Sequence, residues 1–163
     1  MTLRHLFTIS ALTASLCFSA GKAIASTPQQ TESFEMWPGA QYSPSIPTVK
    51  SVLGYNTGER ITTHSDMLTY FKALAEAAPE QVHLVKYAES WEGRALIYVA
   101  IGSPEHIKDL EQFATNMNRL ADPRKTSRDE ANKLIASLPS SVWLQHGVHG
   151  NEISSTDAAM MTA

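Results

Sequence analysis

The sequence predicts an α/β fold in which helices cover a mixed sheet. Segments with apolar residues at helical spacing alternate with shorter apolar runs that are typical of strands, in the order helix, strand, strand, helix, helix, strand, helix. The run at 94–101 is almost continuously apolar, as expected for a strand whose two faces are both covered. The sequence shows no internal repeat, which argues against a solenoid or a propeller.

Two segments ahead of the first helix are predicted to lack regular structure. Residues 26–47 are rich in Pro, Gln, Ser and Thr, which predicts an extended arm. Residues 50–61 contain Gly54 and Gly58 and predict an ordered loop. We therefore expect the globular part of the chain to span residues 48–163.

The first predicted helix begins with Ser65 as its cap and ends at Pro79. Its apolar residues recur at helical spacing, at Met67, Phe71, Leu74 and Ala78. A strand is predicted at 82–87, a turn at 90–93 and a second strand at 94–101.

Two further helices are predicted between the second and third strands. Ser103 is placed to cap the first of them, with Pro104 in the first helical position, and Asp122 marks its end. The apolar stripe of this helix consists of Ile107, Leu110, Ala114, Met117 and Leu120. Ser127 and Glu130 form a capping box that predicts the start of the next helix.

The last predicted elements are a buried strand at 141–145 and a helix at 153–163. The helix has a hydroxyl-rich first turn and apolar residues at Ile153, Ala159 and Met160, but no Gly, Pro or basic residue closes it. We therefore expect the sequence to be the N-terminal portion of a longer domain.

Composition restricts the function class. The 163 residues include 13 Lys and Arg against 16 Asp and Glu, a formal net charge of −3. A mildly acidic chain without a clustered basic face is not typical of a nucleic-acid-binding protein. The single cysteine, Cys17, excludes a disulfide framework and any multi-thiolate metal site within the chain.

The first residues predict a cleavable signal peptide over residues 1–25. Arg4 provides a basic start, residues 6–20 are apolar and uncharged, and Ala23-Ile-Ala25 fits a signal-peptidase site. The apolar run is shorter than the ~20 residues that a membrane-spanning helix needs. We expect a protein exported to the periplasm or secreted, with no membrane attachment after cleavage.

Histidine and carboxylate crowd together only at residues 145–152, between the third predicted strand and the last helix. His149 and Glu152 are three residues apart, and a turn there can aim both side chains at one point. Imidazole nitrogen and carboxylate oxygen are natural zinc ligands, and Gly147 and Gly150 permit tight turns around them. A metal site is the functional interpretation of this segment, and a solvated turn is the alternative.

The other histidines carry weaker signals. His146 offers a second pairing with His149, but its place at the strand end favours a supporting or packing role. His64, His83 and His106 have no carboxylate at a spacing that indicates a metal. The sequence contains neither a Gly-x-Ser-x-Gly elbow nor a glycine-rich phosphate loop, so a serine hydrolase is not favoured.

Three motifs in order resemble the zinc carboxypeptidase (carboxypeptidase A-like) family. HGNE at 149–152, after an apolar run, resembles the family's first zinc-binding motif. SWEGRAL at 90–96 resembles its Ser-x-Glu-Gly-Arg-x-Ile/Leu hairpin, and 53–64 is similar to the lead-in of large exported bacterial members. The resemblance covers roughly residues 44–163 and implies an incomplete, N-terminal part of a zinc-carboxypeptidase-like catalytic domain.

The resemblance implies one Zn²⁺ ion that activates a water for hydrolysis of the peptide bond next to a substrate's C-terminal residue. It makes His149 and Glu152 the first two metal ligands. Asn151 stands where the animal digestive members have arginine and is the candidate substrate-binding residue. Gly93 and Arg94 belong to a hairpin with a structural role. The catalytic residue is unknown, because the general base, a glutamate, and the third ligand, a histidine, are expected beyond this sequence.

Other functions stay open. The HGNE motif also resembles that of the related zinc-dependent N-acyl amino acid deacylases and of peptidoglycan-peptide amidases, which keep the metal and change the substrate. With two ligands and no general base before Ala163, a non-catalytic remnant module is a further alternative, and we expect this chain alone to be inactive. The expected partner is a peptide or protein substrate, not a nucleic acid.

Overall fold

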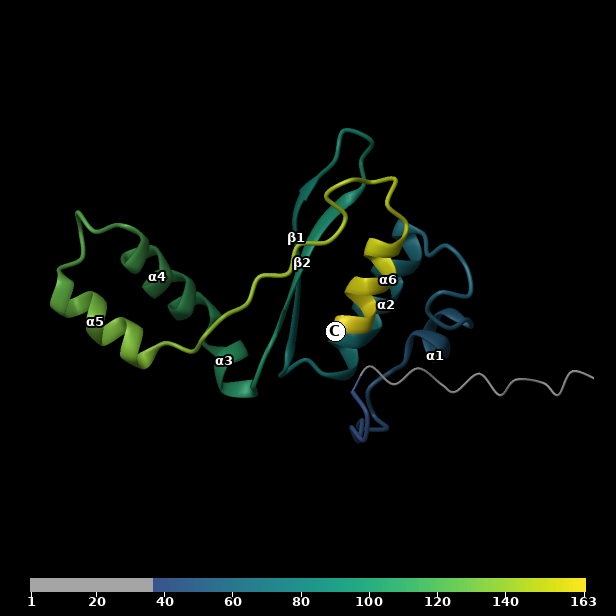
Figure 1. Ribbon diagram of the computed structural model, residues 1–163, viewed down its shortest axis with the longest axis horizontal. Helices are drawn as coiled ribbons and strands as arrows, with labels where there is room; N and C mark the ends of the chain where they lie inside the picture. Colours follow the sequence, from purple (N-terminus) through teal and green to yellow (C-terminus); the bar gives the residue numbers. More distant parts are fainter. Residues whose placement is uncertain (1–36) are drawn as a thin grey trace, which may run out of the picture. The chain divides into compact units, whose positions relative to one another are not determined.

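The computed structural model describes residues 37–163. All the described helices and strands lie in one compact unit, Gln41–Ala163 (Figure 1). The predicted signal peptide with Cys17, and residues 26–36 of the predicted arm, lie outside the described residues. None of the helices within residues 37–163 has the length and apolar character that crossing a membrane requires.

A short helix, α1 (Val49–Leu53), replaces the first part of the predicted loop at 50–61. The Thr48 side chain accepts a hydrogen bond from the amide of Ser51 at the start of this helix. Gly54 adopts the left-handed conformation (φ 80°) at its end and donates its N–H to the Lys50 carbonyl. The glycine that indicated a loop is therefore the residue that ends a helix.

The next helix, α2 (His64–Ala77), confirms the predicted amphipathic helix with a different cap. Thr63, not Ser65, is the N-cap, because its side chain accepts a hydrogen bond from the amide of Asp66. Two hydroxyl residues two positions apart give similar capping signals, and backbone geometry selects the first of them. The buried face of α2 consists of Tyr70, Phe71 and Leu74.

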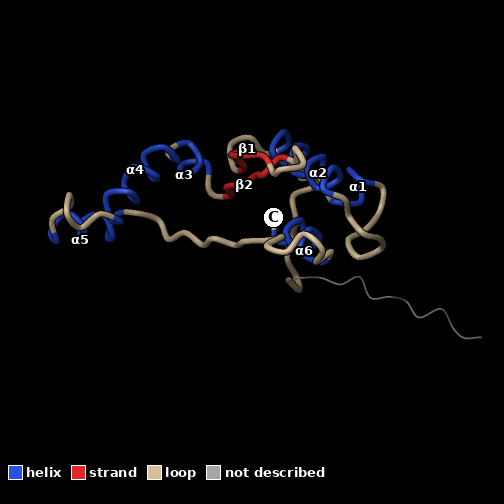
Figure 2. Tube along the Cα trace, turned by 90° about the horizontal axis from the view of Figure 1, so that it is seen from above, coloured by secondary structure: helices blue, strands red, loops and turns tan. Residues whose placement is uncertain are grey.

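The sheet is an antiparallel pair, β1 (Val82–Glu89) and β2 (Ala95–Ile101), which confirms the first two predicted strands (Figure 2). The turn between them closes with a 2.8 Å hydrogen bond from the Ser90 N–H to the Arg94 carbonyl. Gly93 takes the left-handed conformation there, at φ 75°. The turn predicted at 90–93 is therefore present.

Only one face of β2 is covered, which corrects the prediction of a strand buried on both faces. Ile97 and Val99 pack against the core, whereas the alternate residues Leu96 and Tyr98 are exposed. Successive side chains on a strand point to opposite faces. An uninterrupted apolar run therefore shows that both faces of a strand can be buried. It does not show that both faces are buried in the fold.

The long helix predicted after Ser103 is two helices, α3 (Pro104–Lys108) and α4 (Leu110–Ala121). The break lies at Asp109, whose backbone (φ −101°, ψ 21°) departs from helical values. Pro104 begins α3 as predicted, but the Ser103 side chain makes no capping hydrogen bond. The expected apolar stripe is accordingly interrupted between its first and second residues.

The helix α5 (Arg128–Ser137) starts with the predicted capping box. The Ser127 hydroxyl accepts the amide of Glu130, and the Glu130 carboxylate accepts the Ser127 N–H at 3.1 Å. The helix α5 packs against α4, and the side chains of Arg119 and Glu130 approach to 3.6 Å between them.

The two serine caps predict different mutational effects. Ser127→Ala should destabilise α5 by about 1 kcal/mol, because it leaves helix amides without acceptors. Amide hydrogen exchange of α5 residues should then accelerate about fivefold. Ser103→Ala is the matched control, since this cap makes no hydrogen bond through its side chain, and the Ile107 amide should exchange as in wild type. Equal acceleration of amide exchange in both variants would contradict the conclusion that only Ser127 caps its helix through its side chain.

The predicted third strand at 141–145 is wrong. Among the described residues this segment has no strand partner, and Val142, Trp143 and Leu144 are 83%, 76% and 58% exposed. Trp143 meets the sheet through a ring contact alone, with its centroid 6.5 Å from that of Tyr98. A strand is stable only when a neighbouring backbone supplies its hydrogen bonds, and no described backbone does so for this segment.

The final helix, α6 (Ser154–Thr162), confirms the predicted C-terminal helix and packs against α2. Its Met160 joins the buried core, whose members are Val49, Tyr70, Phe71, Leu74, Ala78, Val82 and Met160. The core thus lies among α1, α2, α6 and the covered face of the hairpin. Helices packed on a small antiparallel sheet confirm the α/β class.

Candidate metal site

The candidate site lies in the loop between the extended segment at 141–145 and α6. Gly147 adopts the left-handed conformation in this loop, at φ 70°. A turn follows in which the Glu152 N–H donates to the His149 carbonyl at 3.1 Å. This turn brings side chains three residues apart to the same side of the backbone.

The His149 and Glu152 side chains meet in this turn, as their spacing suggested. Nδ1 of His149 lies 3.0 Å from Oε1 of Glu152. The side chains are 69% and 55% exposed, so this pair, unlike a core hydrogen bond, is open to solutes. One imidazole nitrogen and one carboxylate oxygen thus converge without help from buried packing.

The donor chemistry of the pair fits zinc. Bonds of about 2.1 Å at tetrahedral angles place neighbouring ligand atoms ~3.4 Å apart. The observed separation of 3.0 Å is a few tenths of an ångström below that value. Within residues 37–163, no group of three or more His, Cys, Asp or Glu side chains is arranged to hold a metal. The described residues therefore bring together two side chains of the kinds that ligate zinc, without a third.

His146 is exposed, and neither a hydrogen bond nor an ion pair connects it to His149 in the described part of the chain. It does not belong to the buried core. Asn151 is likewise exposed, within the turn between the two candidate ligands. Its position leaves the carboxamide accessible to a solute near the pair.

The hairpin residues Gly93 and Arg94 occupy the β1–β2 turn. Gly93 has the left-handed backbone conformation, at φ 75°, and the Arg94 guanidinium forms an ion pair with Glu92 in the same turn. Both observations are local to the hairpin. Gly93 and Arg94 are therefore both engaged within the β1–β2 turn.

Sequence reasoning missed a hydrogen-bonded network around Asp157 of α6. Its Oδ2 accepts the N–H of Gly58 at 2.9 Å, and its Oδ1 accepts the hydroxyl of Thr62 at 2.6 Å. The Tyr55 hydroxyl lies 3.2 Å from the Thr62 hydroxyl and 3.3 Å from Oδ2 of Asp66. A carboxylate early in a helix is a common sequence feature, and nothing local indicated a partner almost a hundred residues away.

Asp66 is the second carboxylate of this network. Hydrogen bonding from the Thr63 side chain lowers the pKa of the Asp66 carboxyl, with smaller contributions from the Tyr55 hydroxyl and the Arg60 guanidinium. Arg60 lies 3.6 Å from Oδ2 of Asp66 and 4.0 Å above the centre of the Tyr55 ring. The carboxylate form is therefore favoured in the folded protein.

The depressed pKa of Asp66 predicts a pH dependence of stability. Its folded pKa lies below the unfolded value of about 3.9. The stabilisation is therefore complete above that value and is lost as the pH falls through the folded pKa. Asp66→Asn should lower stability at neutral pH and flatten its decline below about pH 4. Urea unfolding at several pH values measures the slope; Tyr55→Phe should give an intermediate slope, and a wild-type slope in Asp66→Asn would contradict the linkage.

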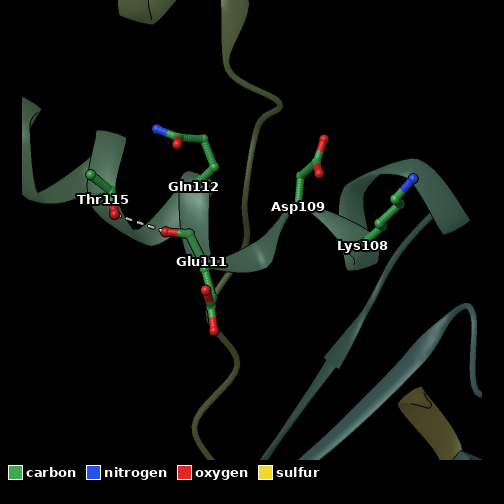
Figure 3. A pocket seen from close by; sticks show the side chains of 5 residues that line it. All are labelled: Lys108, Asp109, Glu111, Gln112 and Thr115. Atoms are coloured by element: carbon green, nitrogen blue, oxygen red, sulfur yellow. Dashed lines mark hydrogen bonds between the residues drawn. The ribbon is translucent and has the colours of Figure 1, made fainter.

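A second feature on the surface is a hollow of about 340 Å³ beside α3 and α4. Its lining consists of Lys108, Asp109, Glu111, Gln112 and Thr115. Figure 3 shows the Asp109 and Glu111 carboxylates pointing in different directions, and the Thr115 hydroxyl donates to the Glu111 carbonyl at 2.9 Å. Because the charged groups do not converge, the hollow offers no ligand set.

An α/β chain with an exposed His–Glu donor pair in the loop before a helix defines a candidate metal-dependent protein. The model of the zinc carboxypeptidase family matches residues 67–163, which include β1, β2, the donor pair and α6. The chain therefore belongs to the zinc carboxypeptidase family. No curated protein and no solved structure shows a significant match to it.

Proposed function

We propose that this chain provides part of the catalytic domain of a zinc-dependent metallocarboxypeptidase, with His149 and Glu152 as the first two metal ligands. Family membership supports the class of enzyme. The observation that carries the ligand assignment is the 3.0 Å approach of His149 Nδ1 to Glu152 Oε1 in an accessible turn.

In this proposal, His149 contributes a neutral imidazole nitrogen and Glu152 a carboxylate oxygen to a single ion. A bound Zn²⁺ supplies a Lewis acid that lowers the pKa of a water ligand and polarises a peptide carbonyl. The turn between the two residues holds their donor atoms together before binding, which reduces the ordering cost. Asn151, which is exposed in the same turn, is proposed to contact the substrate.

The chain alone is proposed to be inactive. No third donor accompanies the pair within residues 37–163, and catalytic zinc ordinarily has three protein ligands. A general base must also lie within hydrogen-bond reach of the water it deprotonates. We therefore assign neither the third ligand nor the general base to the described residues.

A zinc titration followed by NMR tests the ligand assignment. Zn²⁺ should shift the His149 ring and Glu152 amide resonances saturably, and a chelator should reverse the shifts. Peptide hydrolysis by the 163-residue chain should remain at background. Zinc-dependent hydrolysis by this chain would contradict its proposed inactivity, and unchanged resonances at His149 would contradict the assignment.

The peptidase activity is tested on the full product of the gene. It should release the C-terminal residue from a peptide with a free carboxylate, and should leave the same peptide with an amidated C-terminus intact. Equal cleavage of both peptides would argue against a carboxypeptidase. Hydrolysis confined to N-acyl amino acids or to peptidoglycan peptides would indicate the related deacylases or amidases.

We also propose that the protein is exported, on the basis of the signal-like sequence at residues 1–25. N-terminal sequencing of the protein recovered from the periplasm or the medium should begin at Ser26. Recovery of a protein that retains Met1 in the cytoplasm would contradict export.

A further inference from the structure

The segment that carries the candidate ligands is attached to the rest of the fold through α6. Residues 141–150 are all exposed, whereas Met160 is 2% exposed and packs in the core. Asp157 is three residues before Met160, so both side chains lie on the same face of α6. The helix is thus held by one apolar contact region and one polar contact region.

Asp157 makes the polar attachment. Within residues 37–163, its contacts with Gly58 and Thr62 are the only hydrogen bonds that join residues 141–163 to earlier parts of the fold. Both carboxylate oxygens are used, one on a backbone amide and one on a hydroxyl. Two bonds to different groups fix the orientation of the carboxylate as well as its position.

Thr62, one of the two groups that donate to Asp157, is itself buried and hydrogen-bonded. Thr62 is 5% exposed, and its hydroxyl lies within hydrogen-bond distance of the Tyr55 hydroxyl. Tyr55 is also buried, with Arg60 over its ring. The segment from Tyr55 to Thr62 is therefore buried at both of its ends.

The fixed helix leads directly to the candidate ligands. The Ser155 N–H, in the first turn of α6, donates to the Glu152 carbonyl at 3.3 Å. The Glu152 N–H in turn donates to the His149 carbonyl at 3.1 Å. A continuous set of backbone hydrogen bonds therefore links the helix that Asp157 holds to both ligands.

We propose that Asp157, with Thr62 as its partner, is a positioning residue for the zinc-binding pair. This inference rests on the proposed function, because it assigns a role toward the metal that His149 and Glu152 would hold. The Asp157–Thr62 contact fixes the first turns of α6 and thereby restricts the conformations of the 149–152 turn. Without this contact, the donor atoms of His149 and Glu152 are still present, but a smaller fraction of molecules holds them in the arrangement that binds zinc.

The experiment separates the hydroxyl from simple packing at Thr62. Thr62→Val removes the donor and keeps the volume, whereas Thr62→Ser keeps the donor. Asp157→Asn removes the charge, and its matched control is Asp129→Asn. Asp129 is also a carboxylate in the first turn of a helix, α5, but it has no hydrogen bond to a distant segment in the described structure. Each variant is titrated with Zn²⁺ and followed at the His149 ring resonances.

We expect Thr62→Val and Asp157→Asn to weaken zinc binding about tenfold, the lower end of the range for residues that orient metal ligands. Thr62→Ser and Asp129→Asn should stay within about twofold of wild type. Backbone ¹⁵N order parameters of residues 149–152 in the metal-free protein should fall in the first two variants only. A merely structural role would lower the unfolding midpoint without these changes in the folded population.

The outcomes distinguish the two proposals. Wild-type zinc affinity and wild-type order parameters in folded Thr62→Val would overturn the positioning role alone. Equal weakening by Thr62→Ser would also overturn it, because packing and not the hydroxyl would then be responsible. If Asp157→Asn does not fold, the comparison of Thr62→Val with Thr62→Ser tests the positioning role. Failure of the wild-type chain to show zinc-dependent shifts at His149 would overturn the proposed function and this inference together.

Discussion

Replacing His149 with alanine should abolish the saturable effect of Zn²⁺ on the Gly150 and Glu152 amide resonances. The described part of the chain offers zinc two converging donors, and removal of one leaves a single exposed carboxylate. We expect the dissociation constant to rise by about 100-fold or more, because a ligand contributes more than the 10–100-fold typical of residues that only orient ligands. NMR titration measures this directly, and the far-ultraviolet circular dichroism should not change.

Two histidine controls make this result specific. His106 is an exposed histidine in the first turn of α3, and His106→Ala should leave zinc binding unchanged. His146→Ala tests the rival pairing of the two histidines in the loop. It should also bind zinc as wild type does, since His146 is exposed and no hydrogen bond or ion pair joins it to His149 in the described structure. Loss of binding in His146→Ala with retention in Glu152→Gln would replace the proposed ligand pair by the two histidines.

The parts of the fold that the sequence predicted are those with short-range physical causes. The Ser127–Glu130 capping box acts within one helical turn, and it occurs where the pattern placed it. The turn before β2 depends on Gly93 with a positive φ, again a local requirement. The His149–Glu152 approach belongs to this group, because a three-residue spacing needs only one turn to bring the side chains together.

The failures share a different cause. Whether residues 141–145 form a strand depends on a neighbouring backbone, and the apolarity of Val142 or Leu144 carries no information on whether that neighbour is present. The break at Asp109 and the choice of Thr63 over Ser65 as a cap depend on how the chain approaches each helix. Local propensity is weak evidence where two positions compete.

The candidate site shows the same division. Its donor pair could be predicted from adjacent residues, whereas its attachment through Asp157 could not. The partners Gly58 and Thr62 precede Asp157 by 99 and 95 residues, and the three residues do not form a sequence motif. They become neighbours only because α6 packs on α2. The attachment of the candidate site therefore depends on tertiary packing that its own motif does not encode.

That dependence makes Met160→Ala a substitution with a large expected effect on stability. Met160 is 2% exposed and lies in the core that includes Phe71 and Leu74. Truncating a fully buried methionine should cost about 2–5 kcal/mol, from lost burial and from the cavity left behind. Small domains have total stabilities of roughly 5–15 kcal/mol, so the loss is a large fraction of the total. Urea unfolding followed by circular dichroism measures the change.

Met161→Ala is the matched control, because the adjacent methionine is 38% exposed and its truncation should cost well under half as much. Equal destabilisation by the two variants would contradict the observed orientation of α6, in which Met160 faces the core and Met161 is partly exposed. Met160→Ala should also weaken zinc binding, but only in proportion to the loss of the docked helix, whereas Thr62→Val should weaken it in protein that remains folded. The comparison therefore separates the packing that holds α6 in place from the hydrogen bonds that orient the loop preceding it.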